Sequence, residues 1–307
     1  MIYTMRARQS GVWNEILSKS TSIAWGSDKD TLAVDLSFNS LKELTEGTIV
    51  ELLIDSKVTF MGSAIEKNKT KNQFSYSCQD FARVLGKNET IIQFNKITGS
   101  TAIKQLCAKF GVKANCATIT TLISKIYKDF TLADIIADIL EQAELEKGFK
   151  YIKEMRGDTL YIIKLVDLKI YPKFILSEDL EVTSSIEDMK NKILVVSNDE
   201  NNNRILANVS DPKNINTYGS FQEVLTVEAK DISKAKNIAT NRLAEVNKVF
   251  KDTTLDIIVI SGGEDIRANR LISLKIDSMG LNGWYTIKSC SNTLENGLFK
   301  SSITLEW

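Results

Sequence analysis

Apolar and polar residues alternate along much of the first hundred residues. In TLAVDLSF (31–38) every second residue is a large apolar one, which is the period of a strand with one face on a core and the other towards water. Similar patterns follow at 48–54, 57–66 and 72–78, and Asp55 and Ser56 offer a two-residue turn between the first two of these. Short strands at a spacing of about 8–12 residues predict a barrel or a sandwich.

The period changes to that of a helix between residues 99 and 150. Ser100 can cap a helix over TAIKQLCAKF, and Gly111 suits the position after its last turn. Thr131, followed three residues later by Asp134, predicts the start of a second helix. The apolar face of this second helix is a single stripe, which needs a partner in a core or on another protomer. The stripe consists of Leu132, Ile135, Ile136, Ile139, Leu140 and Ala143.

After residue 150 the pattern returns to strands. Residues 159–171 and 193–197 have strand patterns, and a short helix is expected between them near 184–192. The polar, Asn- and Asp-rich segment 199–220 predicts a hairpin with a mobile tip.

One further helix and four strands are expected in the last eighty residues. Asp231 can cap a helix over 231–250. The run LDIIVI is apolar on both faces, so we expect it to be covered on both sides, one of them by this helix. The four expected strands are 255–260, 270–276, 283–290 and 301–307.

These patterns predict an α+β, β-rich chain with β structure at both ends. A length of 307 residues favours more than one domain. We divide the chain into an N-terminal β domain, a small helical module, an α/β middle segment, and a C-terminal β domain with a packed helix. The boundaries are 1–98, 99–150, 151–225 and 226–307.

The charge and the hydropathy exclude several classes of partner. Lys and Arg number 39, as do Asp and Glu, so no global basic field exists to hold nucleic acid or an anionic membrane. The chain has no run of about 18 apolar residues and no apolar segment at its N-terminus, so we expect neither a membrane segment nor a signal peptide.

The absence of histidine restricts the possible chemistry. Ser-His and Cys-His nucleophilic catalysis, His general acid–base catalysis and nearly all catalytic zinc sites need that residue. The cysteines form no CxxC pair, so we expect reduced, metal-free and mostly buried thiols. These are Cys78, Cys107, Cys116 and Cys290.

The stretch SGGEDIRANR (261–270) combines two adjacent glycines, two adjacent carboxylates and two arginines, a composition that could belong to a phosphate-binding or catalytic site. A phosphate-binding loop must be followed by a helix, but this stretch precedes a strand pattern and contains no GK[ST]. Glu264 and Asp265 are adjacent, and on a turn they would point in different directions. The stretch is therefore interpreted as a tight turn. The alternative of a catalytic pair of carboxyls opposed across a cleft, as glycoside hydrolysis requires, stays open, because a single sequence cannot show such a pair.

Several stretches, in order along nearly the whole chain, resemble the baseplate hub proteins of contractile phage tails and phage-tail-like particles. The stretches include WGSDKDTLAVDLSF (25–38), SCQDFARVLGKNET (77–90), IYKDFTLADIIADIL (126–140) and LNGWYTIKSC (281–290). The nearest pattern is the Gram-positive prophage hub type, within the late control protein D superfamily. Many relatives carry a Ser-His pair after the last stretch, where this chain has Ser291 and Asn292. The positions that match the family motifs are Trp25, Asp28, Lys29, Asp80, Leu85, Lys87, Asn88, Gly283, Trp284 and Tyr285.

The resemblance implies a structural protein with tail-tube-like β-barrel domains at both ends of the chain. In such hubs a homotrimer forms a pseudo-hexameric ring that joins the hexameric tail tube to the trimeric spike. The expected partners are the tube protein, the spike protein and other baseplate proteins, without a catalytic residue, cofactor or metal. The protein would be made in the bacterial cytoplasm and incorporated in a virion tail or a tail-like bacteriocin. The alternatives are a hub-associated peptidoglycan hydrolase and a receptor-binding tail protein.

Overall fold

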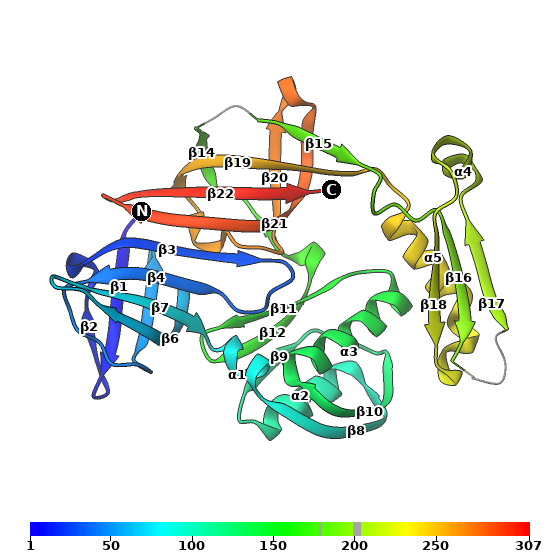
Figure 1. Cartoon of the computed structure of the whole chain (residues 1–307), viewed down its shortest axis with the longest axis horizontal. Helices are drawn as coiled ribbons and strands as arrows, with labels where there is room; N and C mark the ends of the chain where they lie inside the picture. Colours follow the sequence, from blue (N-terminus) through cyan, green and yellow to red (C-terminus); the bar gives the residue numbers. More distant parts are fainter. Residues whose placement is uncertain (178–179, 199–203) are drawn as a thin grey trace.

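A computed structural model describes residues 1–177, 180–198 and 204–307. Within these residues the main element is a 14-stranded sheet that takes strands from both ends of the chain (Figure 1). The N-terminal strands are β1 (Tyr3–Gln9), β2 (Val12–Glu15), β3 (Ser20–Asp28), β4 (Asp35–Ser40), β5 (Ile49–Ile54), β6 (Lys57–Lys69) and β7 (Phe74–Asp80). The others are β13 (Lys169–Ile170), β14 (Lys173–Leu176), β15 (Val182–Ser185), β19 (Phe250–Ser261), β20 (Leu271–Ile276), β21 (Leu281–Glu295) and β22 (Leu298–Glu306).

The two ends of the chain meet in the middle of this sheet. Its strand order is β14-β19-β22-β21-β3-β4-β7-β6-β5-β1-β2, while β13, β15 and β20 pair outside this path. The antiparallel pairing of β3 with β21 joins the N-terminal strands to the C-terminal ones. The strands predicted at 48–54, 57–66 and 72–78 are confirmed, as is the turn at Asp55 and Ser56. Both turn residues have positive φ (47° and 67°), which is the conformation of a type I′ hairpin turn.

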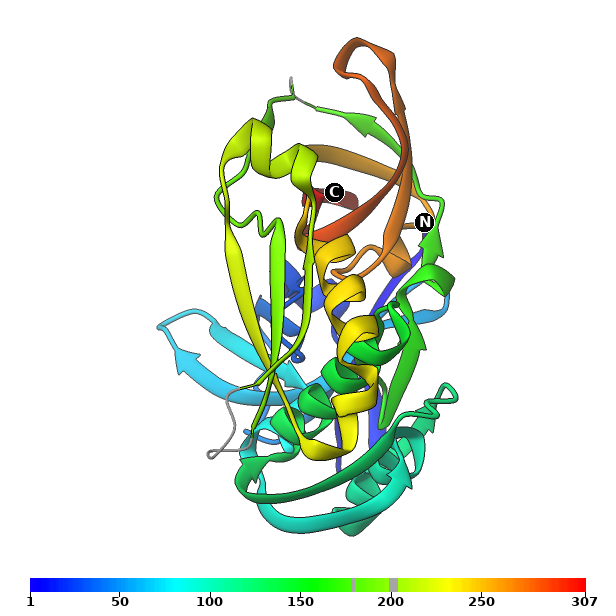
Figure 2. The ribbon, with the colours of Figure 1, turned by 90° about the vertical axis from the view of Figure 1, so that its right-hand side faces the viewer.

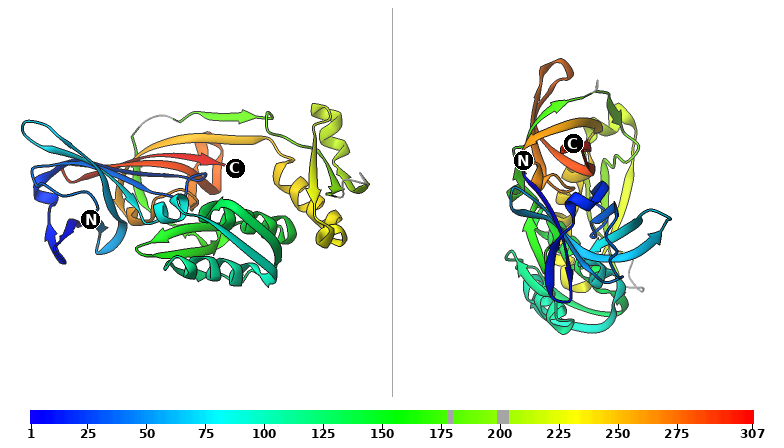
Figure 3. Two further views of the ribbon diagram at one scale, coloured as in Figure 1. Left: turned by 60° about the horizontal axis from the view of Figure 1, so that its bottom comes forward. Right: turned by 90° about the vertical axis from the view of Figure 1, so that its left-hand side faces the viewer.

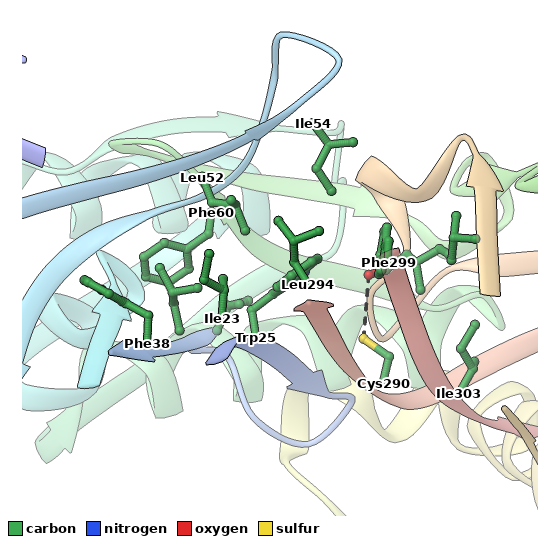
Figure 4. Close-up of a cluster of buried hydrophobic side chains, with 14 of the residues drawn as sticks. Ile23, Trp25, Phe38, Leu52, Ile54, Phe60, Cys290, Leu294, Phe299 and Ile303 are labelled. Carbon is green, nitrogen blue, oxygen red and sulfur yellow. Dashed lines mark hydrogen bonds between the residues drawn. The ribbon is translucent and has the colours of Figure 1, made fainter. Parts of the chain in front are cut away.

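One hydrophobic core lies beneath the whole sheet, which curls round it as a half barrel (Figure 3). Side chains from both ends of the chain meet in this core, as Trp25 and Phe299 do with ring centroids 5.0 Å apart (Figure 4). The separate β-barrel expected at each end is therefore not confirmed, because the two ends share one sheet and one core.

A second core lies in an α/β unit that stands, along the chain, between the N-terminal and the C-terminal strands of the main sheet. The unit pairs β8 with β10, and β12 with both β9 and β11, while the helices cover these strands. Its elements are α1 (Ala82–Lys87), β8 (Glu89–Thr98), α2 (Gly99–Lys109), β9 (Lys113–Cys116), β10 (Leu122–Thr131), α3 (Leu132–Lys147), β11 (Tyr151–Arg156) and β12 (Thr159–Lys164).

Both helices expected in this region are confirmed. The Thr131 hydroxyl accepts a hydrogen bond from the Asp134 N–H, and every residue of the predicted apolar stripe of α3 is buried. The cap of α2 was assigned wrongly: Thr98, not Ser100, accepts from the Thr101 N–H. The segment 99–150 also contains β9 and β10, so it is not purely helical.

The third core lies between a three-stranded sheet and α5 (Figure 2). Its elements are β16 (Lys192–Ser197), β17 (Ile205–Ser210), α4 (Pro212–Tyr218), β18 (Gln222–Val227) and α5 (Ala235–Val246). The hairpin expected within 199–220 is wrong for the described part of that segment, which contains β17 and then α4; β17 pairs antiparallel with β16, a strand that precedes the segment. The expected tip at 199–203 lies outside the described residues. Short 3₁₀ turns occupy Leu17–Lys19, Leu165–Asp167, Ala229–Lys234, Gly263–Asp265 and Asp277–Met279.

Three further expectations for this part of the chain are wrong. Residues 184–192 form no helix: the segment begins in strand β15 and continues into a turn. Asp231 lies in a 3₁₀ turn before α5, whose N-cap is Lys234. The buried side chains of α5 belong to the third core, so this helix does not cover the strand at 255–260. That strand has one buried face, and Ile260 on the other face is 52% exposed.

Candidate interaction surface

The face of the main sheet that points away from the core carries small polar side chains. Alternation places large apolar residues of each strand inside, and the residues between them outside. Strand registers connect these outer residues into a row that crosses strands from both ends of the chain. In order across β19, β22, β21, β3, β4 and β7, the row is Asp256, Ser302, Ser291, Gly26, Asp35 and Gln79.

Two neighbouring rows have the same character. Hydroxyl groups are the most frequent side-chain groups in both rows, and a hollow of about 480 Å³ lies in the face over β3, β21 and β22. One row is Thr254, Thr304, Ser289 and Asp28; the other is Ile258, Lys300, Thr293, Ala24, Ser37 and Ser77. The result is a mainly hydrophilic surface, with the apolar side chains Ile258 and Ile260 of β19 at one side.

Gly26 allows the two halves of the sheet to approach closely at the centre of this face. A Cβ atom at this position would lie 2.8 Å from the carbonyl oxygen of Cys290 on the neighbouring strand. A side chain here would therefore disturb the pairing of β3 with β21.

The stretch 261–270 is a turn, as expected, but its side chains also hold three parts of the chain together. Gly262 has φ of 73°, and the 3₁₀ turn at Gly263–Asp265 follows it. The segment continues into strand β20 rather than a helix, so the phosphate-loop arrangement does not form. Glu264 pairs with Lys57 of β6, whereas Asp265 is exposed, so these two carboxylates do not oppose each other.

The two arginines of this stretch bind a buried carboxylate of the α/β unit. Arg270 Nη2 lies 2.7 Å from Glu154 Oε2 with both side chains almost fully buried, and Arg267 Nε lies 3.7 Å from the same oxygen. Arg156 pairs with the other carboxylate oxygen. Burial alone would raise the pKa of Glu154, but Arg267, Arg270 and Arg156 together hold this pKa below its ordinary value.

A second buried carboxylate, Asp80, lies beside the same cluster. Burial raises the pKa of Asp80 to about 7, although Arg267 and the N–H of Ala82 favour its charged form. The cluster of Glu154, its three arginines and Asp80 thus joins the main sheet to the α/β unit. No local sequence pattern signals this cluster, because its members are neighbours only in the fold.

The family-motif positions near the N-terminus lie at three different places. Trp25 is in the core, the carboxylate of Asp28 accepts from the Asp30 N–H at 2.9 Å, and Lys29 pairs with Glu306. Asp80 accepts from the Ala82 N–H at 3.1 Å, where β7 ends and α1 begins.

The next family-motif positions, Leu85, Lys87 and Asn88, lie in the last turn of α1 and at the residue after it. Leu85 is buried, Lys87 is exposed, and Asn88 donates from Nδ2 to the carbonyl of Val84 at 2.7 Å.

The three positions of β21 lie on both faces of that strand. Tyr285 is buried and packs edge-on against Trp307, with ring centroids 4.9 Å apart. Gly283 is half-buried, and Trp284 is 38% exposed, where it contacts Tyr171. The structure does not bring the ten motif positions together in one site.

Asn292 is fully buried. Its side-chain oxygen accepts from the Ser301 hydroxyl at 2.6 Å, and its Nδ2 donates to the carbonyl of Ile266 at 3.4 Å. The asparagine therefore connects β21, β22 and the turn after β19.

The cysteine thiols are free, and three of the four are buried. Burial raises the pKa of Cys78 and of Cys107 to about 12. Among the residues that the structure describes, no group of three or more His, Cys, Asp or Glu side chains could hold a metal ion. No helix in these same ranges has the length and apolar character needed to cross a membrane.

Comparisons with known proteins identify a family and a shared fold. The family model described as YQBQ-like matches residues 23–306. The tail protein from Neisseria meningitidis MC58 is similar in structure with a TM-score of 0.74 at 13% identity, over 100% of this chain and 97% of that chain. The 43 kDa tail protein of prophage MuSo2 from Shewanella oneidensis has a TM-score of 0.69 at 13% identity, over 99% and 97%.

A third similar structure is prophage tail protein gp18 from Listeria monocytogenes EGD-e. Its TM-score is 0.68 at 10% identity, over 99% of this chain and 94% of that chain. A search of curated proteins finds no match. At these identities the likeness establishes the fold.

Proposed function

Because the chain belongs to the YQBQ-like family and has the fold of phage and prophage tail proteins, we propose that it is a structural component of a tail. More specifically, it is the baseplate hub of a contractile tail or a tail-like bacteriocin. Three copies form a ring that joins the hexameric tail tube to the trimeric spike. Its role is structural, without a catalytic residue, cofactor or metal.

The polar face of the main sheet is the observation that carries this proposal. The lining of a channel must stay hydrated and must not adhere to what passes through it. Small hydroxyl side chains meet this requirement, since they hydrogen-bond water and offer little apolar area. The row from Asp256 to Gln79 contains two serines, two aspartates, a glutamine and a glycine, so it carries no apolar side chain over strands from both ends of the chain.

The two groups of strands also suit a change of symmetry. Each protomer contributes one N-terminal and one C-terminal group of strands to the same sheet. Three protomers would therefore present six groups of strands to a six-fold tube. The other side of the ring keeps the true three-fold symmetry that a trimeric spike requires.

We assign the annulus to the main sheet, whose strands come from residues 3–80, 169–185 and 250–306. The α/β unit and the unit around α5 then lie outside the annulus, where they can contact other baseplate proteins. In this arrangement the ten family-motif positions hold the elements in place rather than bind a ligand.

Deletion of the gene from the producing strain tests the proposal. Electron microscopy should then show no tails with a complete baseplate, and expression of the chain in trans should restore them. Complete, functional baseplates in the deletion strain would contradict the hub role. Clearing of a peptidoglycan gel by the purified chain, lost in a single carboxylate variant such as Glu264→Gln, would favour a hydrolase instead.

A further inference from the structure

Three buried polar atoms that have no hydrogen-bond partner among the described residues belong to side chains lining one small cavity. They are Nε1 of Trp25, Oγ1 of Thr59 and Oε2 of Glu264. The cavity measures about 10 Å³, and Ser27, Arg267 and Asn292 complete its polar lining. We propose that this cavity is a binding site for a structural water molecule that bridges Trp25, Thr59 and Glu264.

The donors and acceptors around the cavity match the bonding capacity of water. An indole N–H can only donate, an ionised carboxylate can only accept, and a hydroxyl can do either. One water therefore accepts from Trp25, donates to Glu264 and makes its third bond with Thr59. Three bonds are typical of a buried water, and about 10–15 Å³ is the volume that one such molecule needs.

The charged groups beside the cavity have partners elsewhere. The other oxygen of Glu264 is held by Lys57, and Arg267 is directed towards Glu154, with its Nε 3.7 Å from that carboxylate. A metal ion does not fit the site, because the N–H of Trp25 cannot coordinate a cation. An anion does not fit either, since the carboxylate of Glu264 would repel it.

The site lies where three segments of the chain meet. Trp25 comes from β3, Thr59 from β6 and Glu264 from the turn after β19. Trp25 also packs on Phe299 of β22 at the centre of the main core (Figure 4). A bridging water thus connects the N-terminal and C-terminal strands through hydrogen bonds beside their apolar contact.

A second cavity of about 30 Å³ lies next to the first. The two cavities share Val34, Thr59 and Arg267, and the second extends to Asp80 and Arg156. The water site is therefore part of the polar joint between the main sheet and the α/β unit.

A high-resolution crystal structure of the purified chain tests the proposal directly. We expect one isotropic density peak at about 2.7–3.2 Å from Trp25 Nε1, Thr59 Oγ1 and Glu264 Oε2. The proposal is overturned if the cavity holds no peak, if these side chains pair with one another, or if the peak has the short oxygen distances of a metal ion.

A pair of isosteric variants tests the energetic role of the bridge. Thr59→Val removes one of the three bonds of the water, so it should lower the midpoint of chemical unfolding. Thr121→Val is the matched control: Thr121 is 3% exposed, its hydroxyl also lacks a partner among the described residues, and it lines neither cavity. Removing an unsatisfied hydroxyl should leave the midpoint unchanged or raise it. If Thr59→Val raises the midpoint as Thr121→Val does, no water bridges this site.

Discussion

Loss of the negative charge at Glu154 should destabilise the protein strongly. The carboxylate of Glu154 has only 4% of its side-chain surface exposed, and the guanidinium of Arg270, 2.7 Å away, belongs to a side chain with 3% exposed. Arg267 lies 3.7 Å from the same oxygen. In Glu154→Gln the shape is kept, but these cations lose their partner and repel each other in a site with little water.

The expected cost follows from the burial of the pair. Unit charges about 4 Å apart interact by about 4 kcal/mol at an effective dielectric constant near 20, and desolvation offsets part of this attraction. Breaking one side of a buried pair costs about 3–5 kcal/mol, because the remaining charge stays buried. That is a large share of the roughly 5–15 kcal/mol by which a domain is stable.

Urea unfolding followed by tryptophan fluorescence measures this cost. The control is Asp158→Asn, which removes an ion pair with Lys113 whose side chains are 61% and 71% exposed, and should cost less than about 1 kcal/mol. The double variant Glu154→Gln with Arg270→Gln should cost less than the sum of the two single variants, because the buried charge is removed with its partner. Equal, small effects of Glu154→Gln and Asp158→Asn would refute the account of the buried joint.

Three further perturbations test other parts of the structure. Burial raises the pKa of Asp80 from 3.8 to about 7, so this side chain binds a proton more readily in the folded state than in the unfolded state, and the protein loses stability as the pH rises from about 4 to 7. Asp80→Asn should therefore gain stability relative to wild type over that pH window, and a difference in unfolding midpoint that stays constant with pH would count against this. Gly26→Ala should lower the free energy of unfolding in urea by about 1–3 kcal/mol, because the new Cβ would meet a backbone carbonyl oxygen at 2.8 Å, whereas the control Gly86→Ala, with open space around it in α1, should not destabilise the protein. Equal effects of the two variants would contradict the close approach of the strands. A thiol reagent should label half-buried Cys116 before buried Cys78, as mass spectrometry of peptides can show, and the reverse order would contradict their burial.

Local patterns in the sequence predicted the elements whose structure depends on near neighbours. The hairpin turn at Asp55 and Ser56 and the cap at Thr131 follow from a few adjacent residues, and both are found. The stripe of α3 was also correct, because the period of a helix alone decides which residues share a face.

Elements that depend on distant partners were missed or misassigned. Residues 182–185 form a strand because β19, much later in the chain, offers an edge to pair with. The pairing of β3 with β21 merges the two ends into one sheet, and no local pattern encodes it. The contact of Arg270 with Glu154 escaped prediction for the same reason: an arginine before a strand usually points to solvent, and only the fold supplies its buried partner.

The polar face was only half visible in the sequence. Alternation places Asp35 on the outer face of its own strand. That Asp35 and Ser291 belong to one continuous row depends on the registers between β21, β3 and β4, which the sequence of a single chain does not reveal.

The most direct test of the hub role is a cryo-EM map of the intact tail. If the chain is the hub, the map should show three copies of it around the tail axis, between tube and spike, with Ser291, Ser302 and Asp35 facing the channel. Six copies per baseplate, a position away from the axis, or this polar face buried against another protein would contradict it.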